Sequence, residues 1–169
     1  RRFHRALARA TTRSAAGPSV SHVAALNMVA HWLPNDAKLD AAAIVFDDRA
    51  MRERWLPEVV ALLTQGHGRL LGHRSTLVQF VPELRLCARV DLHLQDEPQA
   101  AARTVTVYAK ADHEYAGSRT QAAMRALADS RAQAEGRLRT ATPLLWQPGS
   151  GLHWQHEVPG RALAESQHH

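Results

Sequence analysis

The stretch Arg103-Thr-Val-Thr-Val-Tyr-Ala-Lys-Ala-Asp112 decides the fold. Valines and alanines alternate in it with threonine, tyrosine and lysine, and a period of two in a segment rich in β-branched residues predicts a strand. Lys110 stands at the end of this strand, on the face that it shares with Tyr108 and Thr106. Such a lysine is either solvated, as most lysines are, or is held rigidly so that it reaches into a cleft.

The segments on both sides indicate that this strand belongs to an antiparallel sheet. Leu77 to Gln79 and Leu84 to Leu94 are interpreted as two earlier strands of a meander over residues 70–112. A helix is predicted over Ser118 to Ala134, and two short apolar pieces around a Pro/Gly turn predict a later hairpin. We therefore predict an α+β fold in which one helix packs on an antiparallel β-sheet. The expected apolar side of that helix consists of Ala122, Ala123, Met124, Leu127 and Ala128.

Helices are expected before the sheet. Residues 1–32 form a basic N-terminal extension that we predict to be partly helical, with Ser21 as the cap of one helix. Asp47 or Asp48 is expected to cap a second helix over residues 49–64, whose apolar residues fall on one helical face.

Composition limits the class of protein. A chain of 169 residues that is 45% hydrophobic corresponds to about one domain with a sizeable core. The single cysteine, Cys87, excludes an internal disulfide and suggests a reducing, cytoplasmic compartment. No apolar run approaches the roughly 18 residues of a membrane span, so no membrane partner is expected. The formal charge of +5 is compatible with nucleic acid, with a phosphate-bearing ligand or with no specific partner.

Four segments of the sequence occur in the same order as similar segments in the amino-terminal lobe of a known protein family. They are Leu33-Pro-Asn-Asp36, Pro82-Glu-Leu-Arg-Leu-Cys-Ala-Arg89, Val107-Tyr-Ala-Lys110 and Gly151-Leu-His-Trp-Gln-His-Glu-Val-Pro-Gly-Arg-Ala-Leu163. The last segment is similar to a family pattern in which a hydrophobic strand is followed by an acidic residue and then by Pro-Gly-Arg-x-Leu. Together they resemble the amino-terminal lobe of the aminoglycoside phosphotransferase-like family, which has a protein-kinase-like fold and includes choline kinase relatives.

The resemblance implies roles for individual residues. Lys110 would contact the α- and β-phosphates of ATP, where an ammonium gains from partial desolvation. Gln155 would flank the adenine pocket. The backbone carbonyl of His156 and the amide of Val158 would hydrogen-bond the adenine edge.

Two further groups complete the implied nucleotide site. Arg85 and Arg89 stand four apart on one strand, where a family variant carries arginines, and they are either solvated or face phosphate. The lysine of such a lobe pairs with a helix glutamate, but the predicted helix contains none. Glu114, just before the helix, is our choice of partner, and Glu135 at its end is the alternative.

The resemblance covers residues 33–163 as the lobe and leaves 164–169 as a tail or the start of a missing carboxyl-terminal lobe. No His-x-Asp loop with a downstream asparagine follows Leu163, so we expect no catalytic residue and no metal ligand in this chain. Mg²⁺ and a small-molecule acceptor would bind only with that missing lobe.

The leading hypothesis is therefore the ATP-binding lobe of a small-molecule phosphotransferase, a kinase, incomplete and inactive as it stands. The alternative is a non-catalytic protein-interaction module derived from a truncated lobe. A nucleic-acid binder is the weakest hypothesis, because the arginines are not clustered with aromatic residues.

Overall fold

A five-stranded antiparallel sheet forms the centre of the molecule. The computed structural model describes residues 18–112 and 117–158. The sheet has the order β3-β4-β5-β7-β6, and every neighbouring pair is antiparallel. The predicted α+β class with an antiparallel sheet is confirmed. The strands are β3 (Arg69–Val81), β4 (Arg85–Gln95), β5 (Arg103–Asp112), β6 (Pro143–Gln147) and β7 (Leu152–His156).

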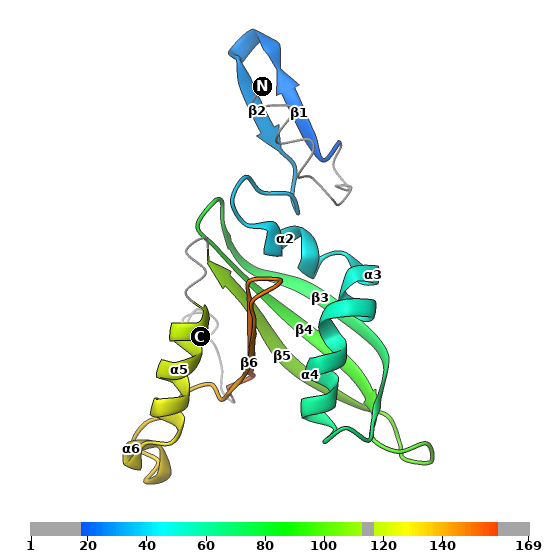
Figure 1. Cartoon of the computed structure of the whole chain (residues 1–169), viewed down its shortest axis with the longest axis vertical. Coiled ribbons are helices and arrows are strands. Elements are labelled where there is room, and N and C mark those ends of the chain that lie inside the picture. The colour runs from blue at the N-terminus through cyan, green and yellow to red at the C-terminus, as the bar shows by residue number, and fades with distance from the viewer. Residues whose placement is uncertain (1–17, 113–116, 159–169) are drawn as a thin grey trace, which may run out of the picture.

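A separate two-stranded hairpin precedes the sheet and projects away from it (Figure 1). Its strands β1 (Val20–Val23) and β2 (Met28–His31) are joined by the 3-10 turn η1 (Ala24–Leu26). Asn27 adopts a left-handed conformation with φ 46°, which closes the turn.

The helix expected from Ser21 onward is therefore wrong for the described residues. The side chain of Ser21 does not cap a helix, because its Oγ accepts a hydrogen bond of 2.9 Å from the indole Nε1 of Trp32 across the hairpin. The β-branched residues Val20, Val23 and Val29 favour a strand over a helix here. Residues 1–17, which carry the rest of the predicted helical extension, lie outside the described residues.

A helical segment lies between the hairpin and the sheet. It comprises α2 (Asp40–Val45), α3 (Asp48–Ala50), the π-helical segment η2 (Met51–Trp55) and α4 (Leu56–Leu63). Asp47 is the N-cap of α3, the start of the second predicted helix, because its Oδ1 accepts a hydrogen bond of 2.9 Å from the backbone N–H of Ala50.

The hydrophobic core lies between these helices and one face of the sheet. On β4, and on β5 from Val107 onward, every second residue is buried, which is the pattern of a sheet with one apolar and one polar face. The core residues on the helical side are Leu39, Ala41, Ala42, Val45, Met51, Trp55, Leu56, Val59 and Val60. The core residues on the sheet are Leu86, Ala88, Val90, Leu92, Leu94, Val107, Ala109, Ala111, Leu145, Leu152 and Trp154.

A buried glutamine joins the last hairpin to the helices. The Gln147 side chain accepts a hydrogen bond of 2.7 Å from the indole of Trp154. Its Nε2 donates to the backbone oxygen of Trp55 at 2.9 Å and to Oε2 of Glu58 at 3.1 Å. The Gln147 side chain therefore links β6, on which it lies, to β7 and to the helical segment that contains η2 and α4.

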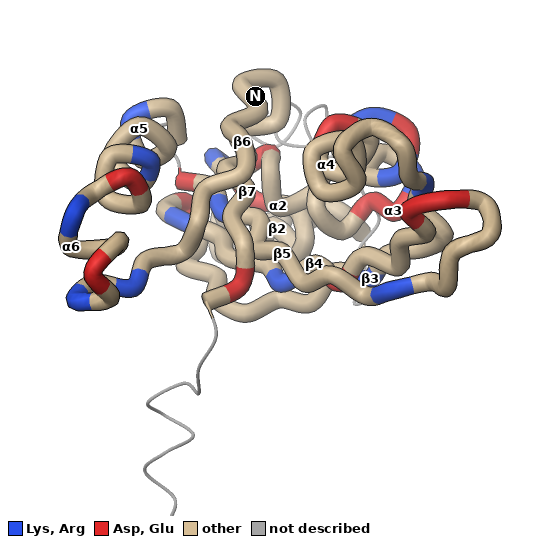
Figure 2. The backbone as a smooth tube through the Cα atoms, turned by 90° about the horizontal axis from the view of Figure 1, so that it is seen from below, with Lys and Arg blue, Asp and Glu red and all other residues tan. Residues whose placement is uncertain are grey.

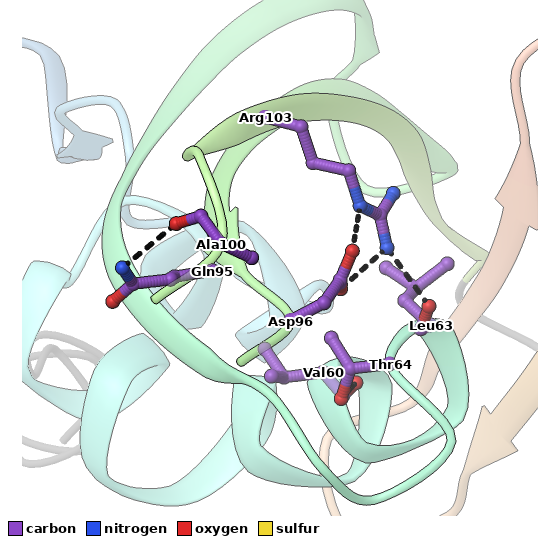
Figure 3. Close-up of polar contacts among 7 residues, drawn as sticks. All are labelled: Val60, Leu63, Thr64, Gln95, Asp96, Ala100 and Arg103. Carbon is purple, nitrogen blue, oxygen red and sulfur yellow. Dashed lines mark hydrogen bonds and ion pairs between the residues drawn. The ribbon is translucent and has the colours of Figure 1, made fainter. Parts of the chain in front are cut away.

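An arginine joins the turn between β4 and β5 to the end of α4 (Figure 3). Arg103 donates to both carboxylate oxygens of Asp96, at 2.6 and 2.9 Å, and Nη2 also donates to the backbone oxygen of Leu63 at 3.1 Å. The Arg103 hydrogen bond holds the pKa of Asp96 below its ordinary value. A cation at the C-terminal end of a helix also complements the helix dipole.

Helices α5 (Gly117–Ala128) and α6 (Arg131–Ala134) follow β5. Viewed from below, they lie on one side of the molecule, while α3 and α4 lie on the other and β6 and β7 run between them (Figure 2). The predicted single helix is thus broken, because Ser130 caps a new turn by accepting a hydrogen bond from the N–H of Gln133.

The buried side of α5 differs from the one that we predicted. Gly117 and Gln121 are its buried residues, whereas Leu127 is 44% exposed. Helix α5 contacts β6 and β7 through this side. Met124 and Ala128 of the predicted apolar side are half-buried, whereas Ala122 and Ala123 are exposed, so the apolar stripe marks the packed face only in part.

Candidate functional site

Lys110 lies on the polar face of the sheet, near the end of its middle strand β5. Its register partners are Cys87 on β4 and His153 on β7, so three chemically active side chains stand side by side across three strands. Adjacent strands are about 4.8 Å apart, which puts each of these side chains within reach of its neighbour. The face opposite the core therefore carries a row of polar groups.

A cavity of about 320 Å³ opens at this row. It lies where the ends of β4 and β5 meet the start of α5 and the β6–β7 hairpin. Its lining residues are Gln79, Arg85, Leu86, Cys87, Lys110, Ala111, Asp112, Gly117, Thr120, Trp146, Gly151 and His153. We call it the lysine cavity.

The lysine cavity gathers positive charge. Lys110 and Arg85 both line it, from neighbouring strands. Among residues 18–112 and 117–158, neither side chain forms an ion pair or a hydrogen bond. The cavity also contains one carboxylate, that of Asp112, which is the cross-strand partner of Arg85. Two cations near one another in a partly enclosed space favour an anionic ligand.

His153 adds a buried and unpartnered imidazole to the same wall. Its side chain is 3% exposed, and neither ring nitrogen has a hydrogen-bond partner within the described part of the chain. Burial, together with the nearby charge of Lys110, lowers the pKa of His153, so the ring is neutral at pH 7. Buried polar groups nearly always have a partner, so this ring marks a place where water or a ligand belongs.

The Cys87 thiol forms another part of the wall. Burial raises its pKa, and Lys110 opposes this by favouring the thiolate. The thiol is therefore protonated and weakly nucleophilic at pH 7.

Arg89 lies on the same face but does not line the cavity. Its Nε donates to Asp91 at 3.0 Å and its Nη2 to Thr106 at 3.3 Å, while the Thr106 hydroxyl donates to Asp91 at 2.7 Å. Burial pushes the pKa of Asp91 upward, but the hydrogen bonds from Thr106 and Arg89 outweigh it and hold that pKa below its ordinary value. Of the two arginines, Arg85 is thus the one at the cavity.

The residues that we assigned to the adenine lie farther along β7. Gln155 is buried opposite Tyr108, and His156 stands opposite Val107, three positions from the Lys110 pair. Three strand residues span about 10 Å. The backbone N–H of His156 donates to the backbone oxygen of Thr142 at 2.8 Å, whereas the adenine contact that we predicted for this residue uses its carbonyl.

Val158 is 40% exposed and lines a second cavity of about 310 Å³. This cavity lies between α6 and the end of β7. Its other lining residues are Gln133, Gly136, Leu138, Arg139, Thr140, Thr142 and Glu157. Of the predicted phosphate residues, Lys110 and Arg85 line the lysine cavity, whereas of the predicted adenine residues only Val158 lines the second cavity.

The expected acidic partner of Lys110 is not found in the described part of the chain. Glu114 lies outside the described residues. Glu135, the alternative, forms ion pairs with Arg131 and Arg137 instead. Gln121 occupies the buried side of α5, with both amide atoms unpartnered.

Sequence reasoning missed part of this site. We considered His153 only as a metal ligand and rejected it because His156 faces the other side, and the two do alternate in facing along β7. Trp146 and Gly117 were not considered as cavity residues. The periodicity of β7 could have placed His153 on the face of Lys110, but only once the pairing of β5 with β7 was known.

Two other features do not occur among the described residues. No group of three or more His, Cys, Asp or Glu side chains there is arranged to hold a metal ion. None of the helices there has the length and apolarity needed to cross a membrane.

Comparison of the chain with protein-family models, with curated proteins and with solved structures finds no match. The resemblance drawn from the sequence therefore depends on the residues alone.

Proposed function

We propose that this chain is the nucleotide-binding lobe of a small-molecule phosphotransferase, with ATP as the ligand. One observation carries the proposal: Lys110 and Arg85 line the same cavity, and Asp112 is the single carboxylate among its described lining residues, so the lining carries more positive than negative charge. A phosphate chain supplies the missing negative charge.

The wider arrangement supports the same proposal. The lysine is held at the end of a central strand, and helix α5 follows that strand before the chain returns to the sheet as β6 and β7. The second cavity is lined by Glu157 and Val158, which are four and five residues after His153 of the lysine row. A nucleoside triphosphate is long enough to place its phosphates at Lys110 and its base toward Val158.

Calorimetric titration of the chain with ATP at low salt tests the proposal. We expect weak binding, because the lobe supplies only part of a nucleotide cleft. Lys110→Met and Arg85→Met should each weaken it roughly tenfold, the equivalent of about 1.4 kcal/mol for one phosphate contact. Arg125→Met is the matched control, because it removes one charge from an exposed position on α5 outside the cavity; its effect should stay below about twofold.

Two results would refute the assignment. The first is the absence of heat at millimolar ATP. The second is equal weakening by Arg125→Met and Lys110→Met, which would indicate nonspecific attraction to the net charge. In a longer chain with a carboxyl-terminal lobe, Lys110→Ala should abolish phosphate transfer without unfolding the protein.

One observation favours the alternative, a protein-interaction module. β3 lies at an edge of the sheet and exposes Leu71, Leu77 and Val78. Exposed edge strands with apolar side chains can accept a further strand from a partner. Absence of ATP binding in the titration above would make this the better assignment.

A further inference from the structure

The turn between β3 and β4 holds a strained residue beside the lysine cavity. Glu83 has φ 61°, in the left-handed region that residues with a Cβ seldom adopt. The turn is closed by a hydrogen bond of 3.0 Å from the N–H of Leu84 to the oxygen of Val81. Such a conformation persists only where its surroundings enforce it.

A carboxylate 47 residues earlier in the chain enforces it. Oδ2 of Asp36 accepts a hydrogen bond of 2.9 Å from the backbone N–H of Glu83. Oδ1 of the same side chain accepts from the N–H groups of Lys38, at 2.8 Å, and Leu39, at 2.9 Å. Both oxygens are engaged, so the carboxylate is fixed in direction as well as in place.

The Asp36 end of this link is next to residues that pack in the hydrophobic core. Leu39 is 2% exposed and is part of the hydrophobic core. Helix α2, which begins at the next residue, contacts both β4 and β5. Asp36 therefore ties the turn to the packed helices.

The Glu83 end of this link is close in sequence to residues that line the lysine cavity. Two residues after Glu83 comes Arg85, and Gln79 lies on the other side of the same turn; both line the lysine cavity. If the turn opened, the last pairs of the β3–β4 ladder, which end at Val81 and Arg85, would separate first.

We propose that Asp36 is a positioning residue that holds the β3–β4 turn closed, and with it Arg85, at the lysine cavity. This inference deepens the proposed function and depends on it only for the identity of the ligand. Asp36 touches no ligand in this proposal, since its two oxygens are bound to backbone N–H groups.

The turn has a second, weaker link that provides a control. Lys38 Nζ forms an ion pair of 2.7 Å with Oε2 of Glu83, with side chains 57% and 48% exposed. An exposed pair of this kind contributes little. Lys38→Ala removes it and leaves the bond from Asp36 to the Glu83 amide in place.

The first experiment needs no ligand. Cys87 is the only cysteine, is half-buried and lines the cavity, so its rate of alkylation by iodoacetamide reports opening of this end of the sheet. Asp36→Ala, and the closer isostere Asp36→Asn if the alanine variant does not fold, should raise the rate roughly threefold or more at a pH where the wild type is stable. Lys38→Ala should leave it within about twofold. An unchanged rate in both Asp36 variants, or an equal rise with Lys38→Ala, would overturn the proposal.

The second experiment asks whether Asp36 acts through Arg85. In an ATP titration, Asp36→Asn should weaken binding roughly fivefold in the wild-type background and by less than about twofold in the Arg85→Met background. Equal effects in the two backgrounds would mean that Asp36 stabilises the fold generally, and the positioning role would be wrong. If wild type does not bind ATP, the proposed function fails, and the alkylation rates alone decide whether Asp36 holds the turn.

Discussion

Replacing Gly117 by alanine probes how α5 is seated beside the lysine cavity. A Cβ at this position would lie 2.8 Å from Cδ2 of Trp146 and still closer to Cε3 and Cζ3 of the same ring. Carbon atoms pack at about 3.5–4.0 Å, so the helix or the indole must move. Neither moves freely, because Gly117 is buried and Trp146 belongs to a paired strand.

The expected cost follows from two opposing effects. Overpacking a well-filled site costs about 1–3 kcal/mol. Exchanging glycine for alanine in a helix returns at most about 1 kcal/mol. With the middle of the first range, about 2 kcal/mol, and a return of up to about 1 kcal/mol, the net loss should be about 1–2 kcal/mol of unfolding free energy. Such a loss lowers the melting temperature of a chain of this size by roughly 2–8 °C.

Urea denaturation and thermal melting measure this loss, and a second substitution identifies its cause. In the Trp146→Ala background the indole is gone, so Gly117→Ala should become neutral or slightly stabilising. Ser118→Ala, at the exposed neighbouring position, serves as the control and should change stability by less than about 0.5 kcal/mol. Wild-type stability of Gly117→Ala, or the same loss with and without Trp146, would refute the packing that we describe for α5.

Two further predictions concern buried polar groups. Gln147→Ala leaves the Trp154 indole N–H without its acceptor and removes the bond to the Trp55 carbonyl, and we expect a loss of about 2–4 kcal/mol in urea denaturation; a loss below about 1 kcal/mol would contradict the network. Burial depresses the pKa of His153 in the folded state, so its contribution to stability is present above pH 6.5, the ordinary histidine pKa, and is lost as the pH falls through the lowered value. Unfolding free energies measured between pH 8 and 5 should therefore fall less steeply for His153→Phe than for wild type, and parallel curves would refute this.

The sequence determined the local structure of most of the sheet and of the capped helix. Alternation of apolar and polar residues fixes which face of β4 and β5 is buried, because successive side chains of a strand point to opposite sides. The cap at Asp47 was equally readable, since a short acidic side chain before an apolar helix has a local partner in the next turn. The alternation in Arg103–Asp112 likewise placed Lys110 on the polar face before any contact was known.

The local sequence pattern did not predict the structure correctly where contacts with distant segments decide the outcome. The hairpin over Val20–His31 formed where a helix was expected, because cross-strand pairing and the bond between Trp32 and Ser21 outweigh a weak helical signal. Helix α5 buries Gln121 instead of Leu127, because its packed side is chosen by the position of β6 and β7.

Only the tertiary structure decided which residues line the lysine cavity. Arg85, Lys110 and His153 come from three strands, and the register between those strands brings them to one wall. A shift of one residue in either pairing would turn a side chain to the opposite face. The sequence specified which residues each strand can present, whereas long-range pairing determined which of them meet, because register is a property of two segments together and not of either one alone.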